Sequence, residues 1–199
     1  MVSRMAGIWF LVAVSIVSLP AVSNAGTVQL PKTGIVLCVD PQGVEIACTG
    51  TGQDGELRSG LAWPDPRFTA NGDGTLTDQL TGRMWSGDAG TPTDGSCIGG
   101  AMSWQAALNY ISCINSNNYL GHNDWRLPNV NDLESLVHIG VPKSYVWLNG
   151  QGFIHAGLSY WSSTTFASST VYAWSVDFDG NRVSYTFKTN NILAWPVRQ

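Results

Sequence analysis

The chain has 199 residues and a formal net charge of −4, with 14 acidic against 10 basic side chains. The basic residues are scattered and form no run, which excludes nucleic acid as an expected partner. Charged residues make up only 12% of the chain, while Gly, Ser, Thr and Asn are plentiful, a loop-rich balance that is typical of exported domains.

Residues 1–25 have the pattern of a secretory signal peptide. Arg4 precedes the apolar run IWFLVAVSIVSL, Pro20 follows that run, and small residues lead up to Ala25. The run is too short for a membrane-spanning helix, which needs about 20 apolar residues. We therefore predict cleavage after Ala25 and secretion to the periplasm, the cell surface or the extracellular medium, with no membrane-spanning segment.

The four cysteines all follow this peptide, and an even number in an exported chain predicts disulfides. Four cysteines allow three pairings. We predict Cys38–Cys48 and Cys97–Cys113, because neighbours in sequence close the shortest loops. The first pair flanks the turn residues Pro-Gln-Gly, and the second would tie a loop to the helix that follows it.

The Pro-rich stretch WPDPRF divides the remaining chain into two parts. Residues 26–65 read as a small β extension, and residues 66–199 as one larger domain. The domain opens with two alternating strands around the turn Asn71-Gly72-Asp73-Gly74. The oxygens of Asn71, Asp73 and Asp78 suggest calcium, but the spacing and terminal Glu of an EF-hand are missing. We favour a plain hairpin turn and predict no cofactor.

Two helices are expected next. Ser103 can cap a helix over 103–115, in which Trp104, Ala107, Leu108, Ile111 and Ile114 recur at helical spacing. The second helix follows the tetrapeptide Trp-Arg-Leu-Pro at 125–128.

That second helix has its own capping signal. Asn129 is the expected N-cap and Asp132 its capping-box partner, and one face carries apolar residues (Val130, Leu133, Leu136 and Val137). We expect Pro128 to hold the entry extended, Trp125 and Leu127 to point into the core, and Arg126 to bond helix or loop carbonyls.

After residue 158 the apolar pattern changes to period two. It predicts consecutive strands at 160–164, 171–178, 182–187 and 192–197, with a hairpin turn at Asp179-Gly180-Asn181. The expected fold class is α+β, with two helices packed on an antiparallel β meander and an N-terminal β extension.

Successive connections of a meander alternate between its two ends, which places the candidate binding residues. The loop at 165–170 and the loop at 189–191 should share one end, opposite the turn at 179–181. Binding residues concentrate on such loops. This end offers one apolar ring, neutral hydrogen-bonding groups and one cation, a mix suited to an uncharged sugar or a peptide: Phe166, Ser168, Ser169, Lys188, Asn190 and Asn191.

The residues that an enzyme would need are thinly represented. The three histidines, His122, His138 and His155, lack metal-protease spacing, and the chain contains no Gly-x-Ser-x-Gly elbow. With all cysteines assigned to disulfides, no catalytic thiol is left. We therefore predict a protein that is not an enzyme and that has no metal site.

Several ordered motifs together resemble a known family: GTGQDGE at 50–56, PRFTANGDGTLTDQLTGRMW at 66–85, DWRLPNVNDLESLV at 124–137, YWSSTT at 160–165 and AWPVR at 194–198. They are similar to the C-terminal domain of the Legionella collagen-like adhesin. The resemblance implies a C-type-lectin-like fold in bacterial exported or surface proteins, one of which is an adhesin that binds glycosaminoglycans. This sequence lacks collagen-like Gly-X-Y repeats and is acidic, so neither a trimeric stalk nor binding of sulfated polyanions is carried over.

The leading hypothesis is accordingly an exported, non-enzymatic recognition module that binds a glycan or a protein ligand. The alternative is a structural or assembly component of a cell-envelope complex. Calcium-dependent sugar binding is not favoured, because the tripeptide at 127–129 has Leu where calcium-binding lectins carry a carboxylate or amide. The sequence predicts no oligomeric state.

Overall fold

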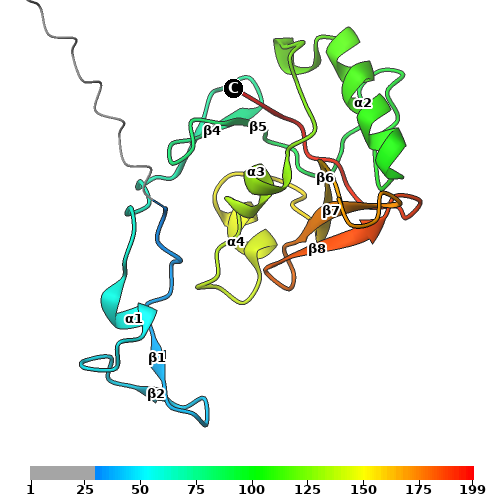
Figure 1. The fold of residues 1–199 in the computed structure, drawn as a ribbon. Coiled ribbons are helices and arrows are strands. Elements are labelled where there is room, and N and C mark those ends of the chain that lie inside the picture. The colour runs from blue at the N-terminus through cyan, green and yellow to red at the C-terminus, as the bar shows by residue number, and fades with distance from the viewer. Residues whose placement is uncertain (1–29) are drawn as a thin grey trace, which may run out of the picture.

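The computed structural model describes residues 30–199, so the predicted signal peptide lies outside the described residues. The chain forms a mixed α/β structure with antiparallel sheets, in which a small N-terminal extension lies beside a larger globular part (Figure 1). In the part of the chain that is described, no helix is both long and apolar enough to cross a membrane.

The extension is a disulfide-stapled hairpin. Strands β1 (Cys38–Val39) and β2 (Glu45–Ile46) pair antiparallel, and the Cys38–Cys48 bridge closes the hairpin as predicted. A single helical turn, α1 (Asp54–Leu57), follows, which the sequence did not predict. Its Glu56 carboxylate accepts hydrogen bonds from the backbone N–H groups of Gly50 and Gly52, which lowers its pKa.

Trp63 fastens this extension to the larger part. Its indole N–H donates to the Lys32 carbonyl at 2.9 Å, and its ring lies 4.7 Å from the His138 ring. Beneath it the Arg67 guanidinium, 4.6 Å from the indole centroid, forms a buried ion pair with Asp78 at 2.9 Å. The extension therefore packs on the larger part through an aromatic and cationic cluster that also includes Trp147, whose ring lies 5.4 Å from Trp63.

The predicted hairpin after the Pro-rich stretch is present. It comprises β3 (Phe68–Ala70) and β4 (Thr75–Asp78), and β5 (Met84–Ser86) adds a third strand. The Asp73 carboxylate accepts from the Thr75 N–H and hydroxyl, which closes the turn and lowers the Asp73 pKa. Because Asp78 is buried against Arg67, the three oxygens considered for calcium do not form one site.

The prediction of the last strand was wrong in both its position and the strand with which it pairs. The sequence suggested a fourth meander strand at 192–197, whereas β9 comprises only Val197–Arg198 and pairs with β5, in the order β3-β4-β5-β9. Pro196 lacks the N–H that a longer ladder would need. The preceding Trp195 instead fills the core, 5.3 Å from Trp85, with its indole N–H on the Ser86 carbonyl.

The first predicted helix is confirmed as α2 (Trp104–Ser116). The Ser103 side chain accepts from the Ala106 N–H, as expected of the N-cap. The Cys97–Cys113 disulfide ties the preceding loop to this helix, and a short 3-10 turn, η1 (Tyr119–Gly121), follows.

The second predicted helix is shorter than its apolar pattern suggested. It is α3 (Val130–Glu134), with the predicted capping box between Asn129 and Asp132. Leu136 follows the last residue of α3 and is still buried. The apolar pattern therefore extends past the end of the helix. Helix α4 (Ser144–Gly150) was not predicted, and it starts after Lys143, whose side chain makes no capping hydrogen bond.

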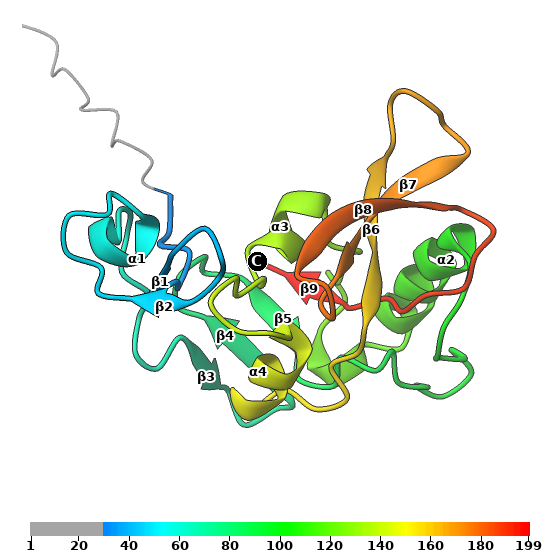
Figure 2. The same ribbon diagram turned by 90° about the horizontal axis from the view of Figure 1, so that it is seen from below.

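The third sheet has the order β6-β7-β8 and is antiparallel, as the meander predicted: β6 (Ser159–Thr165), β7 (Tyr172–Asp177) and β8 (Arg182–Phe187). Helices α2 and α3 lie on opposite sides of it (Figure 2). One core group includes Tyr160 and Val176 from the α3 side, and the other includes Trp161 and Ala173 from the α2 side. The sheet is thus the layer between two cores, and its outer end projects beyond α3.

Candidate functional site

Five aromatic side chains gather where the third sheet projects beyond α3, and we call them the aromatic platform: Phe166, Tyr172, Trp174, Tyr185 and Phe187. Alternation explains their common face. Trp174 pairs with Tyr185 across β7 and β8, and Tyr172 pairs with Phe187, so the residues between them point to the α2 side. Tyr185 is 51% exposed and Phe187 49% exposed, so the platform is an open surface.

The rings hold one another in place. Phe166 stacks on Tyr185 with centroids 4.5 Å apart and an interplanar angle of 9°, and Tyr172 lies 4.1 Å from Phe187. Trp174 meets Phe166 edge-on at 5.2 Å. Such packed pairs stabilise each other by about 0.5–1.5 kcal/mol beyond the area they bury. The five rings therefore form one mutually packed group.

The tyrosine hydroxyls show that this surface is not closed core. The buried Tyr110, Tyr119 and Tyr160 all have hydrogen-bonded hydroxyls, to Pro92, Ser86 and Gly157. Among the described residues, the hydroxyls of Tyr172 and Tyr185 have no protein partner. Apolar ring faces with free polar tips are the chemistry that stacks on, and hydrogen-bonds to, a sugar ring or a peptide.

The two predicted binding loops do lie at this end. The Lys188 N–H donates to the Val171 carbonyl at 3.0 Å, which extends the β7–β8 pairing to the residues next to both loops. The β6–β7 loop projects at the top of Figure 2. Ser168 is exposed and Ser169 half-buried, and the exposed Asn190 and Asn191 lie on the second loop.

Of the predicted binding residues, only Phe166 belongs to the platform. The Lys188 side chain makes contacts away from it. The Lys188 ammonium lies 3.9 Å from the Trp104 ring centroid on α2 and donates to the Thr165 hydroxyl at 3.0 Å. Sequence reasoning missed Tyr185 and Phe187 as surface residues. Their alternation was visible, but alternation alone does not tell an inward face from an uncovered one.

The opposite end of the sheet is occupied by internal contacts. The Asn181 side chain accepts from the Ser144 N–H and donates to the Val141 carbonyl, while Asp179 pairs with Lys143 at 2.7 Å. Asp177 pairs with Arg182. The turn at 179–181 therefore anchors α4, which leaves the platform end as the open one.

The tetrapeptide at 125–128 is a structural element. Trp125 is 3% exposed, its indole N–H donates to the Tyr119 carbonyl at 2.8 Å, and its backbone exchanges two hydrogen bonds with the Asn115 side chain. Leu127 is equally buried, as predicted.

Arg126 differs from the prediction, because its partner is a carboxylate and not a carbonyl. It donates to Asp132 at 2.6 Å, and Arg83 approaches the other oxygen of that carboxylate at 3.3 Å. Burial opposes the ionisation of Asp132. The hydrogen bonds from Arg126 and the Asn129 N–H, together with both positive charges, outweigh burial and lower the Asp132 pKa.

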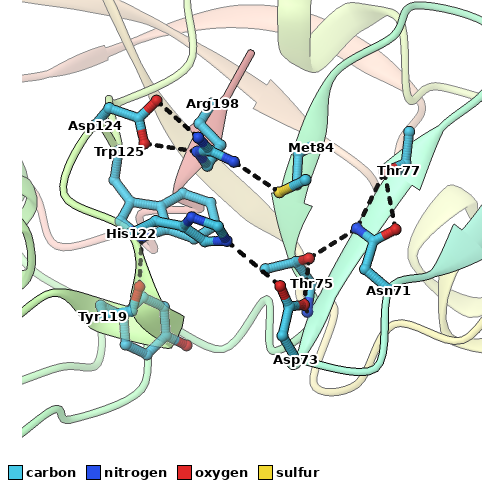
Figure 3. A network of polar contacts seen from close by, with 10 residues as sticks. All are labelled: Asn71, Asp73, Thr75, Thr77, Met84, Tyr119, His122, Asp124, Trp125 and Arg198. Carbon is cyan, nitrogen blue, oxygen red and sulfur yellow. Dashed lines mark hydrogen bonds and ion pairs between the residues drawn. The ribbon is translucent and has the colours of Figure 1, made fainter.

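A surface network next to Trp125 joins the two ends of the domain (Figure 3). Arg198 donates to both oxygens of Asp124, at 2.6 and 3.1 Å, and the pair lowers the Asp124 pKa. His122, in edge contact with Trp125, lies 3.4 Å from Asp73 in the β3–β4 turn. These contacts clamp the C-terminal strand and the first hairpin onto the motif at 122–125.

The histidines do not converge. His122 meets Asp73, His155 meets Asp88 at 3.1 Å, and His138 lies between Trp63 and Trp147. Over residues 30–199 no group of three His, Cys, Asp or Glu side chains is placed to hold a metal ion.

The domain thus combines antiparallel sheets with an uncovered aromatic surface at one end of the third sheet. Residues 74–198 match the Lcl C-terminal domain, and the chain belongs to that family. No curated protein matches the chain. The matched segment begins at Gly74, in the turn of the first hairpin, and contains β4, the tetrapeptide and the platform. Strand β3 and the disulfide-stapled extension lie outside it.

Proposed function

We propose that this protein is an exported, non-enzymatic recognition module that binds a glycan on the aromatic platform. The observation that carries the proposal is the half-exposed, mutually stacked set of rings at the open end of the third sheet. Aromatic faces stack on the apolar faces of pyranose rings, and the neutral groups of Ser168, Asn190 and Asn191 lie on the neighbouring loops to bond hydroxyls.

Membership of the Lcl C-terminal domain family supports an adhesin-like role. The C-type-lectin-like fold implied by the sequence motifs is part of the proposal, as is export. Two disulfides support export, because such bridges persist in oxidising compartments outside the cytoplasm. That the protein has no cofactor and is not an enzyme is also part of the proposal. It rests on the sequence, in which no reactive group of a known kind was recognised.

Glycan-array binding of the purified chain, with and without EDTA, tests the proposal. We expect binding that EDTA does not change and that is lost in the double variant Tyr185→Ala/Phe187→Ala. The matched control is Ile98→Ala/Val146→Ala, which removes exposed apolar side chains elsewhere. Loss of binding in EDTA would show a metal-dependent site, and full binding by the platform variant would place the site elsewhere.

A second candidate, an assembly role in a cell-envelope complex, is favoured by one observation. The extension exposes eight large apolar side chains: Leu30, Val36, Leu37, Val39, Val44, Ile46, Leu57 and Leu61. Exposed apolar area of this kind marks interaction surfaces. If assembly is the function, Val39→Ser/Ile46→Ser will abolish association with an envelope partner in crosslinking and leave array binding unchanged.

A further inference from the structure

A hollow adjoins the inner edge of the platform, between α3 and the strands β7 and β8. It has a volume of about 300 Å³ and is lined by Val130, Glu134, Trp174 and Val183. Trp174 belongs both to this hollow and to the platform, where it meets Phe166. A ligand lying across the platform therefore reaches the hollow at its α3 end.

The hollow presents one carboxylate that is available to a ligand. Glu134 is exposed, and among residues 30–199 its side chain forms no hydrogen bond or ion pair. The charged groups on the surrounding elements are already engaged. Arg182 on β8 pairs with Asp177 at 2.9 Å, and Asp132 on α3 holds both Arg83 and Arg126. Lys188, which follows β8, lies against Trp104 on the other side of the sheet.

A carboxylate beside an indole and two branched aliphatic side chains has the chemistry of a site for an organic cation. The carboxylate attracts the charge, the indole adds a cation–π attraction, and the valines cover the apolar part of the ligand. The chain as a whole is also negative, which favours the approach of positively charged ligands.

We propose that this hollow is a subsite for the protonated amino group of a hexosamine unit within the glycan on the platform. The inference rests on the proposed function and deepens it, because it adds a charge preference to a surface that is otherwise neutral. Phe166 and Tyr185 stack face to face on each other, so a pyranose ring of the glycan would lie against the exposed part of Tyr185.

Three β-1,4-linked hexasaccharides of equal length test the proposal: the glucosamine oligomer with free amines, the N-acetylglucosamine oligomer and cellohexaose. Affinities are measured by calorimetry at low salt and mildly acidic pH, where the free amines are protonated. We expect the glucosamine oligomer to bind about five to ten times more tightly than the other two. Glu134→Gln should erase this preference, and Glu134→Lys should reverse it. The matched control Glu45→Gln, in the extension, removes the same charge from an exposed site and should keep it.

The outcomes separate the subsite from the proposed function. Equal affinity for the three oligomers would overturn the subsite and leave the platform as a glycan surface. If the wild-type chain binds none of them, the hexosamine assignment fails, and the glycan array decides the proposed function independently. Glu134-dependent binding of hexalysine without binding of the glucosamine oligomer would assign the hollow to a basic peptide and overturn the hexosamine proposal.

Discussion

Two aromatic regions of this domain, the one around Trp125 and the platform, are built from the same residue types. They differ in how far their rings are exposed to solvent. Around Trp125 the ring is covered, the indole N–H is bonded to the Tyr119 carbonyl, and the Tyr119 hydroxyl lies 3.1 Å from Ser86. On the platform, Tyr185 and Phe187 remain half exposed. Richness in aromatic residues therefore does not distinguish core from open surface. Coverage of the rings and bonding of their polar tips do.

If the Trp125 region holds the fold, its truncation should give the largest loss of stability. We predict that Trp125→Ala lowers the free energy of unfolding by about 3–5 kcal/mol, because it leaves a cavity and unpairs the Tyr119 carbonyl. Denaturant titration measures this loss. Tyr185→Ala, on the open surface, should cost about 1 kcal/mol or less. Equal losses in the two variants would remove the distinction between the regions.

The Cys97–Cys113 disulfide links the loop before α2 to α2 itself, on the side of the third sheet opposite α3. Its loop spans 16 residues, so Cys97→Ser/Cys113→Ser should lower the free energy of unfolding by about 3 kcal/mol. The measurement is thermal unfolding under non-reducing conditions. Mass mapping of the wild-type protein under non-reducing conditions should find this bridge together with Cys38–Cys48, and free thiols in protein recovered from the periplasm or medium would contradict both.

Two carboxylates near Trp125 sharpen the comparison between covered and open sites. Asp132 is buried, caps α3 and accepts from Arg126, so Asp132→Asn should cost about 1–3 kcal/mol. Asp124 is exposed although Arg198 bonds both its oxygens, so Asp124→Asn should cost about 1 kcal/mol or less. Denaturant titration of both variants at neutral pH tests the order, and a larger loss for Asp124→Asn would reverse the assignment.

His138 gives the smallest expected effect, and it depends on pH. Burial first, and then the Arg67 charge, lower the pKa of His138 below its ordinary value of 6.5. The unfolded chain then binds a proton more readily than the folded one. This contribution to stability is present above about pH 6.5 and is lost as pH falls through the lower folded-state pKa. Stability of His138→Phe should fall less steeply over that window, and parallel pH profiles would contradict the account.

Much of the local structure was predictable because its signals are local. The capping box of Asn129 and Asp132, the Ser103 cap and the turn around Asp73 each depend on neighbours in the chain. Sequence proximity also gave both disulfides. The partner of β9 was not predictable, because it depends on Trp195 filling a core built by β5, more than a hundred residues earlier in the sequence.

The position of the two loops was predictable, whereas the make-up of the surface beside them was not. Because the connections of a meander alternate between its ends, the sequence placed Phe166 and both loops at one end of the sheet, where the Lys188 N–H donates to the Val171 carbonyl. The alternating pattern of 182–187 predicted a strand but not that Tyr185 and Phe187 would be exposed, since nothing in the sequence says that α3 ends at Glu134 and leaves them uncovered. Lys188 was named as a possible contact, although Trp104 and Thr165 already hold it.

Calorimetric titration of Tyr185→Ala/Phe187→Ala with the glycan that binds most strongly on the array tests the central claim most directly. Losing two stacking faces should weaken affinity at least about tenfold, while the melting temperature stays close to that of the wild type. The control Ile98→Ala/Val146→Ala should bind normally. Wild-type affinity in the platform variant would contradict the claim, as would a large drop in its melting temperature, because the rings would then belong to the core.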